Sequence, residues 1–357
     1  MTRRRLTSLV AACLGAAVPA QGQRRKKKKK DEELPTQTLE LPKELPLALA
    51  AETSRLVFHA APLSNKGLLS QQVRDGVRTL LGMTKGAAPV RLRAFVSGTG
   101  DMRRVPAIVS EEFTQRRLPL PVLTVVQVGP LPLDGAQVAM EAISVDRRAV
   151  NPHGLAFIGM QAEANGDPLA PQAPLAEKVI ERVQRAAGGG EVLAVTCFAS
   201  MLDGAAQSKL RAAFPRAAFH YVQAMRAPSR AFLGCEAVAR LQEAVAGGVS
   251  IRDNVAQVSA PWIAVSGGQV GFHNSEDDIR LALQRLDKAL AAAQSSFKQS
   301  FYLRDYVLTR GFADRVRAME REFYEAGRRP VISDIQVESL PGLDATFAVD
   351  VIAISNR

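Results

Sequence analysis

The chain has 357 residues, enough for two or three domains with proper cores, and its 47% hydrophobic and 23% charged residues are typical of globular proteins. The net charge is +11, but ten of the 46 Lys and Arg residues lie within residues 1–30, so that 36 basic residues face 35 acidic ones in the remainder. A nearly neutral body has no broad field to attract phosphate backbones, which argues against a nucleic-acid partner.

The first 22 residues are typical of an export signal. A basic stretch, "MTRRR", precedes the short apolar run "LTSLVAACLGAAV", and small residues up to Ala20 are suited to cleavage. "TRRRLT" resembles a twin-arginine signal. "VAAC" ending at Cys13 resembles a lipobox, but lipidation is the less favoured interpretation because the apolar run continues past Cys13. We expect a signal peptide over residues 1–22 and a periplasmic or extracellular protein; a frayed N-terminal helix is the alternative.

Residues 23–46 are charged, proline-spaced and of low complexity. Such a segment buries too little apolar surface to offset its chain entropy, so we expect a disordered linker. Its run Lys26 to Lys30 is interpreted as a solvated tail, with contact to an anionic lipid or polymer surface as the alternative.

Three units with the same order of elements follow, which we place at residues 47–150, 151–250 and 251–357. In the first, the patterns predict strands over 54–62, 90–98, 122–129 and 136–145 and helices over 70–82 and 105–116. In the second, they predict strands over 154–163, 191–200, 218–225 and 231–239 and helices over 173–190 and 205–214. In the third, they predict strands over 262–272, 300–308, 332–340 and 345–355 and helices over 275–293 and 312–327.

This recurrence predicts an α+β fold in which each unit is a mixed sheet with two helices on one face. The other sheet face also carries apolar side chains, which something must bury. Three sheets packed around a pseudo-threefold axis would do so within one chain. We therefore expect a monomeric intramolecular pseudo-trimer, with the middle unit the most degenerate.

The most telling stretches are "VSGGQVG", "YVLTRGFADRVRAMEREFY" and "RPVISDIQVESLP" followed by "FAVDVIAIS" in the third unit, and "LPVLTVVQVGPLPLDGAQVAMEAIS" in the first. They resemble the reactive-intermediate deaminase (Rid, or YjgF-type) family. The resemblance implies a chorismate-mutase-like fold, a trimer of such units and ligand clefts between neighbouring units. This chain would then be a whole trimer fused into one polypeptide.

The family motif that grips a substrate carboxylate is incomplete in every unit. Deaminating members carry an arginine before the serine or threonine of that motif, and a guanidinium fork suits a carboxylate. By the resemblance, Leu123, Phe219 and Ile332 occupy the arginine position here. None of these side chains can bind an anion, so we expect apolar clefts between the units.

The family also places a carboxylate on the last strand, and the resemblance assigns Glu141, Glu236 and Asp350 to that position. A carboxylate in a partly desolvated cleft can act as a general acid or base, so these three are the catalytic candidates. The alternative is that each is paired with a backbone amide or a basic neighbour at a unit interface.

Further residues are candidates for ligand binding. Leu123 and Ile332 line the expected clefts, and Arg329 or Arg304 could supply a substitute clamp, although Arg304 and Asp305 also suit an exposed edge pair. The turn "SGGQ" would allow a ligand close to the backbone, or simply join two strands. Its residues are Ser266, Gly267, Gly268 and Gln269.

No cofactor motif is present, and the four histidines are scattered, so we expect neither cofactor nor metal. Cys197 and Cys235 lie in apolar strand-like runs; an oxidising compartment would permit a disulfide, but we interpret them as two small buried hydrophobic residues. The favoured function is binding of a small metabolite, or a structural role. An enamine or imine hydrolase using the three carboxylates is the alternative.

Overall fold

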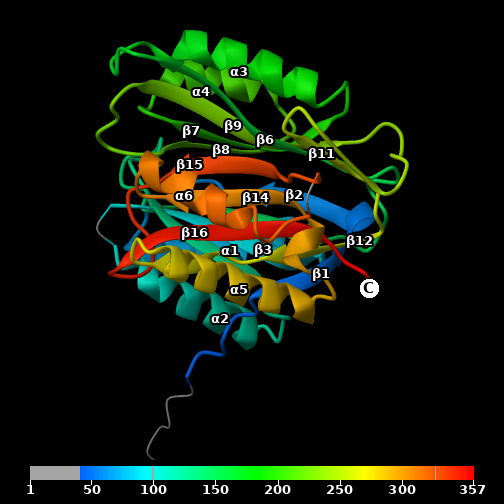
Figure 1. The fold of residues 1–357 in the computed structure, drawn as a ribbon. Helices are drawn as coiled ribbons and strands as arrows, with labels where there is room; N and C mark the ends of the chain where they lie inside the picture. Colours follow the sequence, from blue (N-terminus) through cyan, green and yellow to red (C-terminus); the bar gives the residue numbers. More distant parts are fainter. Residues whose placement is uncertain (1–40, 99, 326) are drawn as a thin grey trace, which may run out of the picture. The chain divides into compact units, whose positions relative to one another are not determined.

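Three β-sheets and six α-helices make up the computed structural model of the chain, which describes residues 41–98, 100–325 and 327–357 (Figure 1). The predicted signal peptide and most of the predicted linker, including Lys26 to Lys30, lie outside the described residues. None of the described helices is long and apolar enough to cross a membrane. Short 3-10 helices occupy Thr53–Arg55, Met102–Arg104 and Phe297–Gln299.

The first sheet has the strand order β2-β5-β3-β4, with β3 and β4 parallel and the other pairs antiparallel. Its helices pack on one face because their apolar residues recur at helical spacing; α1 buries Val73, Val77 and Leu80 in this way. The elements are β2 (Leu56–Ala60), α1 (Leu69–Met83), β3 (Ala88–Ser97), α2 (Val105–Gln115), β4 (Val122–Val128) and β5 (Val138–Val145).

The second sheet repeats this order as β6-β9-β7-β8 and adds the hairpin β10-β11 beside β6, which the sequence analysis missed. Asp253 and Asn254 turn the hairpin with positive φ angles of 49° and 60°, a conformation that Asp and Asn tolerate. The elements are β6 (Leu155–Asn165), α3 (Gln172–Ala186), β7 (Val192–Ala199), α4 (Gly204–Ala213), β8 (Ala218–Gln223), β9 (Ala231–Arg240), β10 (Val249–Arg252) and β11 (Val255–Val258).

The third sheet has the order β1-β12-β16-β14-β15, with β13 also paired to β16. The single strand predicted over 262–272 is two strands, and the helix predicted over 312–327 ends at Glu320. The edge strand β1 comes from the start of the described chain, in the segment that the sequence placed in the first unit. The elements are β1 (Ala48–Glu52), β12 (Trp262–Ser266), β13 (Gln269–Phe272), α5 (Glu276–Ala292), β14 (Ser300–Val307), α6 (Arg310–Glu320), β15 (Val331–Gln336) and β16 (Ala345–Ile354).

The α+β fold class is confirmed. Each sheet contains the same four-strand order: β2-β5-β3-β4, β6-β9-β7-β8 and β12-β16-β14-β15. In each, the last two strands of that order are parallel. Each sheet has its own core against its two helices. The faces away from the helices pack together, and one apolar cluster joins Phe95, Phe198 and Tyr306 from the three sheets. The strands that meet there are buried on both faces, as β3 and β14 are along nearly their whole length.

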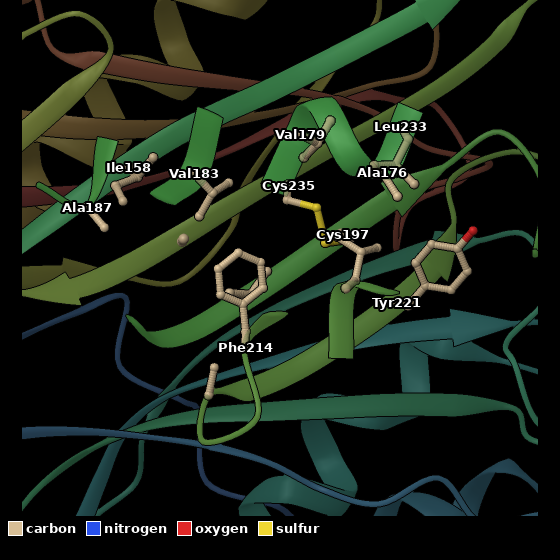
Figure 2. Packing of buried hydrophobic residues seen from close by; sticks show 14 of the residues in the cluster. Ile158, Ala176, Val179, Val183, Ala187, Cys197, Phe214, Tyr221, Leu233 and Cys235 are labelled. Atoms are coloured by element: carbon tan, nitrogen blue, oxygen red, sulfur yellow. A yellow bond between two sulfur atoms is a disulfide. The ribbon is translucent and has the colours of Figure 1, made fainter. Parts of the chain in front are cut away.

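Cys197 and Cys235 form a disulfide in the core between the second sheet and its helices (Figure 2). The two cysteines face each other in the register of β7 and β9, so strand pairing alone brings their side chains together. The interpretation of two unlinked hydrophobic residues was therefore wrong. Val179 and Val183 of α3 belong to the same core as the bridge.

Candidate functional site

The three catalytic candidates occupy one structural position, repeated in each sheet. In the strand register, Glu141 lies opposite Arg93, Glu236 opposite Thr196, and Asp350 opposite Arg304. All three carboxylates point to the inner face, where the sheets pack together. The sequence motif and the pleat together place them there, since alternate residues of a strand share a face.

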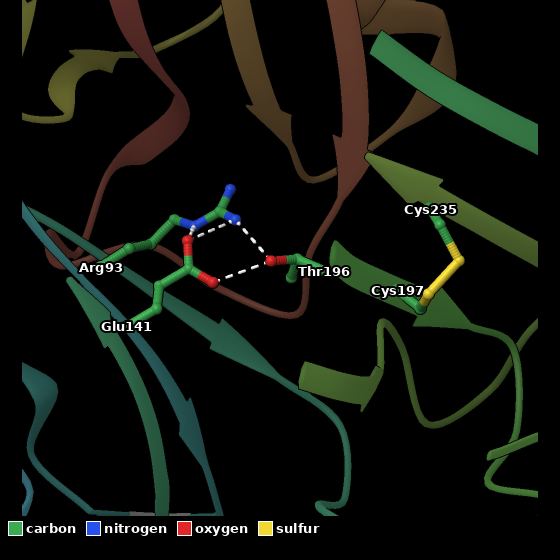
Figure 3. The surroundings of a disulfide bond; sticks show 5 residues. All are labelled: Arg93, Glu141, Thr196, Cys197 and Cys235. Atoms are coloured by element: carbon green, nitrogen blue, oxygen red, sulfur yellow. Dashed lines mark hydrogen bonds and ion pairs between the residues drawn. A yellow bond between two sulfur atoms is a disulfide. The ribbon is translucent and has the colours of Figure 1, made fainter. Parts of the chain in front are cut away.

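Arg93 joins the first sheet to the second (Figure 3). Its Nε donates to Glu141 Oε1 at 2.7 Å, and its Nη2 lies 2.5 Å from Glu236 Oε1. Thr196 Oγ1 accepts from Arg93 Nη2 at 3.2 Å and donates to Glu141 Oε2 at 2.8 Å. Arg93 Nη1 also donates to Tyr306 Oη of the third sheet at 3.0 Å.

Asp350 and Arg304 extend the same network. Arg304 Nε donates to Glu236 Oε2 at 2.9 Å, and its Nη1 lies 3.3 Å from Asp350 Oδ1. Asp350 Oδ2 accepts from Arg91 Nη2 at 2.7 Å and from Tyr306 Oη at 3.0 Å. We call these six charged groups the central ion network: Arg91, Arg93, Arg304, Glu141, Glu236 and Asp350.

The central ion network is balanced in charge, three guanidinium groups against three carboxylates, and nearly all of it is buried. Burial alone would raise the pKa of Glu236, but Arg304 and Arg93 together lower it to about 2. Burial lowers the pKa of Arg91, despite the attraction of Asp350. Burial lowers the pKa of Arg93 and Arg304, but nearby carboxylates stabilise the charged guanidinium groups and raise it overall. Glu141 and Glu236 act on Arg93 in this way, and Glu236 acts on Arg304. Glu236 therefore stays ionised and is not poised to exchange a proton near neutral pH.

A cavity of about 30 Å³ lies beside the network. It is large enough for about one water molecule and too small for a metabolite. Glu141, whose side chain is 22% exposed, is the least buried carboxylate there. All three carboxylates pair with basic neighbours where the units meet. These are the contacts that the alternative interpretation of the sequence described.

The predicted glycine turn lies in a closed seam between the first and third sheets. Gly268 N donates to Leu123 O at 3.1 Å, and a Cβ added at Gly267 would lie 2.6 Å from the same oxygen. The glycines therefore serve close packing of two backbones and leave no room for a ligand. Ser266 Oγ accepts from Val351 N, and the Gln269 amide donates to Val270 O. The backbone of Leu123 lies at this seam, and its side chain packs against the core between the first sheet and its helices.

A larger space, which we call the sheet 2–3 cleft, has a volume of about 700 Å³. Its walls come from β6, β9 and the 224–230 loop of the second sheet, and from β15 and α6 of the third. Ile332 lines it, as predicted for that position, and also lines an adjoining space of about 360 Å³, which the exposed Arg329 borders. Arg304 and Asp305 are buried in a central strand, so the interpretation as an exposed edge pair was wrong.

The expectation of apolar clefts between the units was also wrong. Arg230, Arg310 and Arg317 line the sheet 2–3 cleft together with apolar side chains. Nothing in "PSRAF" or "LTRGF" distinguishes Arg230 or Arg310 from ordinary surface residues. Arg91 and Arg93 were missed as well, although two charges at alternate positions of the apolar run "VRLRAFV" signal a polar stripe on a buried strand.

A second buried polar cluster lies between the third sheet and α6. Asp305 of β14 and Glu320 of α6 are fully buried, and no donor from another group reaches their carboxyl oxygens among the described residues. Burial without a donor favours the neutral, protonated form of both carboxyls. Burial and the neighbouring Asp334 raise the pKa of Asp305 to about 7, and burial with Asp305 raises that of Glu320 well above its usual range. Arg317 pairs with Asp334 at 3.0 Å.

Neither polar cluster has the arrangement of a metal centre: no group of three or more His, Cys, Asp or Glu residues in the described ranges is placed to hold an ion.

No family model and no curated protein matches the chain. Solved structures that resemble parts of it include a YjgF-family protein from Neisseria meningitidis, 14% identical over 29% of this chain and 85% of that one, with a TM-score of 0.25. A YjgF/YER057c/UK114-family protein from Mycobacterium tuberculosis is 22% identical over 26% of this chain and 78% of its own, with a TM-score of 0.24. TdcF from E. coli, solved with bound serine, is 18% identical over 26% of this chain and 81% of its own, with a TM-score of 0.24. The first two are of the family that the sequence motifs resemble.

Proposed function

We propose that the chain is a Rid/YjgF-like binding module that holds a small molecule in the sheet 2–3 cleft, and that its three family carboxylates stabilise the fold instead of hydrolysing imines. The observation that carries this is the separation of the two sites. The carboxylates are held in a balanced network beside room for one water molecule, whereas the cleft of about 700 Å³ lies elsewhere. That volume is within the range of small-molecule sites.

The location that we propose is outside the cytoplasm. The disulfide between Cys197 and Cys235 supports it, because such bonds persist in oxidising compartments and are rare in reducing ones. The export pattern of the first 22 residues supports it independently.

Blocking the cleft tests the binding function. Naphthol, a neutral aromatic probe, is expected to bind the native protein, and Ala227→Trp is expected to weaken this binding roughly tenfold, about 1.4 kcal/mol. Ala227 is exposed and lines the cleft, so a larger side chain there occupies the site without entering the core. Isothermal titration calorimetry measures both affinities.

Ala318→Trp is the matched control, since Ala318 is exposed on α6 and does not line the cleft. Equal naphthol affinities in both variants, or no binding to the native protein, would refute the cleft as a binding site.

The second candidate function, an enamine or imine hydrolase, is favoured by one observation. Glu141 is partly exposed and borders the small cavity beside the central ion network. Movement of the first and second sheets apart would be needed to admit a substrate there, because the cavity holds only about one water molecule.

A further inference from the structure

Two arginines line the sheet 2–3 cleft without a carboxylate partner. Arg230 lies at the end of the loop before β9, and Arg310 is the first residue of α6, so the two reach the cleft from different sheets. Among the described residues, no Asp or Glu lies within ion-pair distance of either. Arg317, by contrast, lines the same cleft and pairs with Asp314 at 2.7 Å and Asp334 at 3.0 Å.

The Arg230 side chain has a hydrogen-bonding atom that is enclosed but unused. Its Nε is buried, and no acceptor reaches it within the described part of the chain. A buried donor without an acceptor lowers stability, and an acceptor on a bound molecule would remove that cost. The Nε of a guanidinium is one of the two donors that a carboxylate or phosphate accepts side by side.

The two guanidinium groups line the same cleft. Burial and the charge of Arg230 both lower the pKa of Arg310. Like charges placed together with no counter-charge destabilise the free protein, and a bound anion would relieve the repulsion. The two arginines thus add positive charge without a carboxylate partner to the cleft wall.

Apolar side chains make up most of the remaining cleft wall, which also includes Asp314 and Asp334, both paired with Arg317. Phe198 and Phe232 of the second sheet line it, with Met160, Met225 and Ile332. Aromatic and methionine side chains give an adaptable surface for a flat apolar group. Unpaired positive charge and a large apolar surface in one cleft would recognise a molecule that has both an anionic group and an apolar body.

We propose that Arg230 and Arg310 form an anion clamp, and that the ligand of the cleft is a small carboxylate or phosphate ester with an apolar body. This inference rests on the proposed binding function and adds the chemical class of the ligand. The clamp would use positions in the second and third units that differ from Leu123, Phe219 and Ile332.

Three probes with one aromatic body separate the clamp from the cleft itself: naphthol, naphthoate and naphthyl phosphate. Isothermal titration calorimetry of the full native protein is expected to show that at least one anion binds about tenfold or more tightly than naphthol. Arg230→Gln and Arg310→Gln are each expected to lower the affinity for that anion about tenfold. Neither variant is expected to change the affinity for naphthol by more than about twofold. The anion that gains more distinguishes a carboxylate from a phosphate ligand.

Matched controls come from the same two segments. Arg226→Gln lies in the same loop as Arg230, and Arg315→Gln lies on α6, but neither residue lines the cleft. Both variants are expected to bind every probe as the native protein does.

Equal affinity of the three probes for the native protein would overturn the anion clamp and leave the binding function standing. The same holds if the control variants lose as much affinity for the anions as Arg230→Gln and Arg310→Gln, because general charge would then explain the gain. Absence of binding by all three probes would overturn both proposals.

Discussion

Replacing Arg93 by methionine is expected to lower the free energy of unfolding by about 3–5 kcal/mol, the cost of removing one partner from a buried ion pair. The variant leaves Glu236 buried without one of its two guanidinium partners and Glu141 without its only charged contact among the described residues. Burial then favours protonation of Glu236. Denaturation by urea, followed by circular dichroism, measures the change.

A pair on the surface provides the comparison. Lys209 and Glu177 lie 2.7 Å apart with side chains that are 45% and 59% exposed, so Lys209→Met should change stability by less than about 1 kcal/mol. The double variant Arg93→Met with Glu236→Gln should recover part of the lost free energy of unfolding, because it also removes the buried carboxylate charge of Glu236. A loss below about 1 kcal/mol for Arg93→Met would show that the central ion network contributes little to the fold.

Replacing Asp305 by asparagine is expected to stabilise the protein at alkaline pH. The pKa of Asp305 in the folded protein is about 7, above its usual value, so the folded state binds the proton more tightly than the unfolded chain. The stability that this proton contributes is complete below the unfolded pKa, near pH 4, and is lost as pH rises through about 7. Asparagine keeps a neutral side chain of similar size at this buried position at every pH.

The expected gain is on the order of 2 kcal/mol at roughly pH 8 and vanishes near roughly pH 5, measured as a shift in melting temperature. The charged groups around Asp305 are Glu320, Asp334, Arg317 and Asp350, none of which the substitution changes. Asp344→Asn, at an exposed position, should shift the melting temperature equally little at both pH values. A gain for Asp305→Asn that does not depend on pH would show that its carboxyl is not protonated in the folded protein.

The repeated order of elements could be predicted because it depends on local patterns. Helical spacing in α1 or α5 and apolar strand runs in β5 or β16 are visible in the sequence, and three passes of one order predict three sheets that bury a common face. The boundaries of α6 and the split between β12 and β13 were missed because they depend on close packing. The split falls at Gly267, where the backbone of another sheet passes within contact distance.

The polar sites could be predicted only in part. Motif position placed Glu141, Glu236 and Asp350 on the inner face, but their partners come from other sheets. Arg91 and Asp350 are separated by 259 residues in the chain, so no local pattern connects them. The cleft arginines depend in the same way on how the second and third sheets approach each other.

The measurement that tests the account most directly is imine turnover by the native protein. An imine formed in solution from an amino acid by an oxidase is expected to hydrolyse at the same rate with and without the protein, since no substrate can reach the carboxylates beside a cavity of about 30 Å³. The Glu141→Gln variant is expected to leave that rate unchanged. Acceleration by the native protein that Glu141→Gln abolishes would contradict the account and establish the chain as a hydrolase.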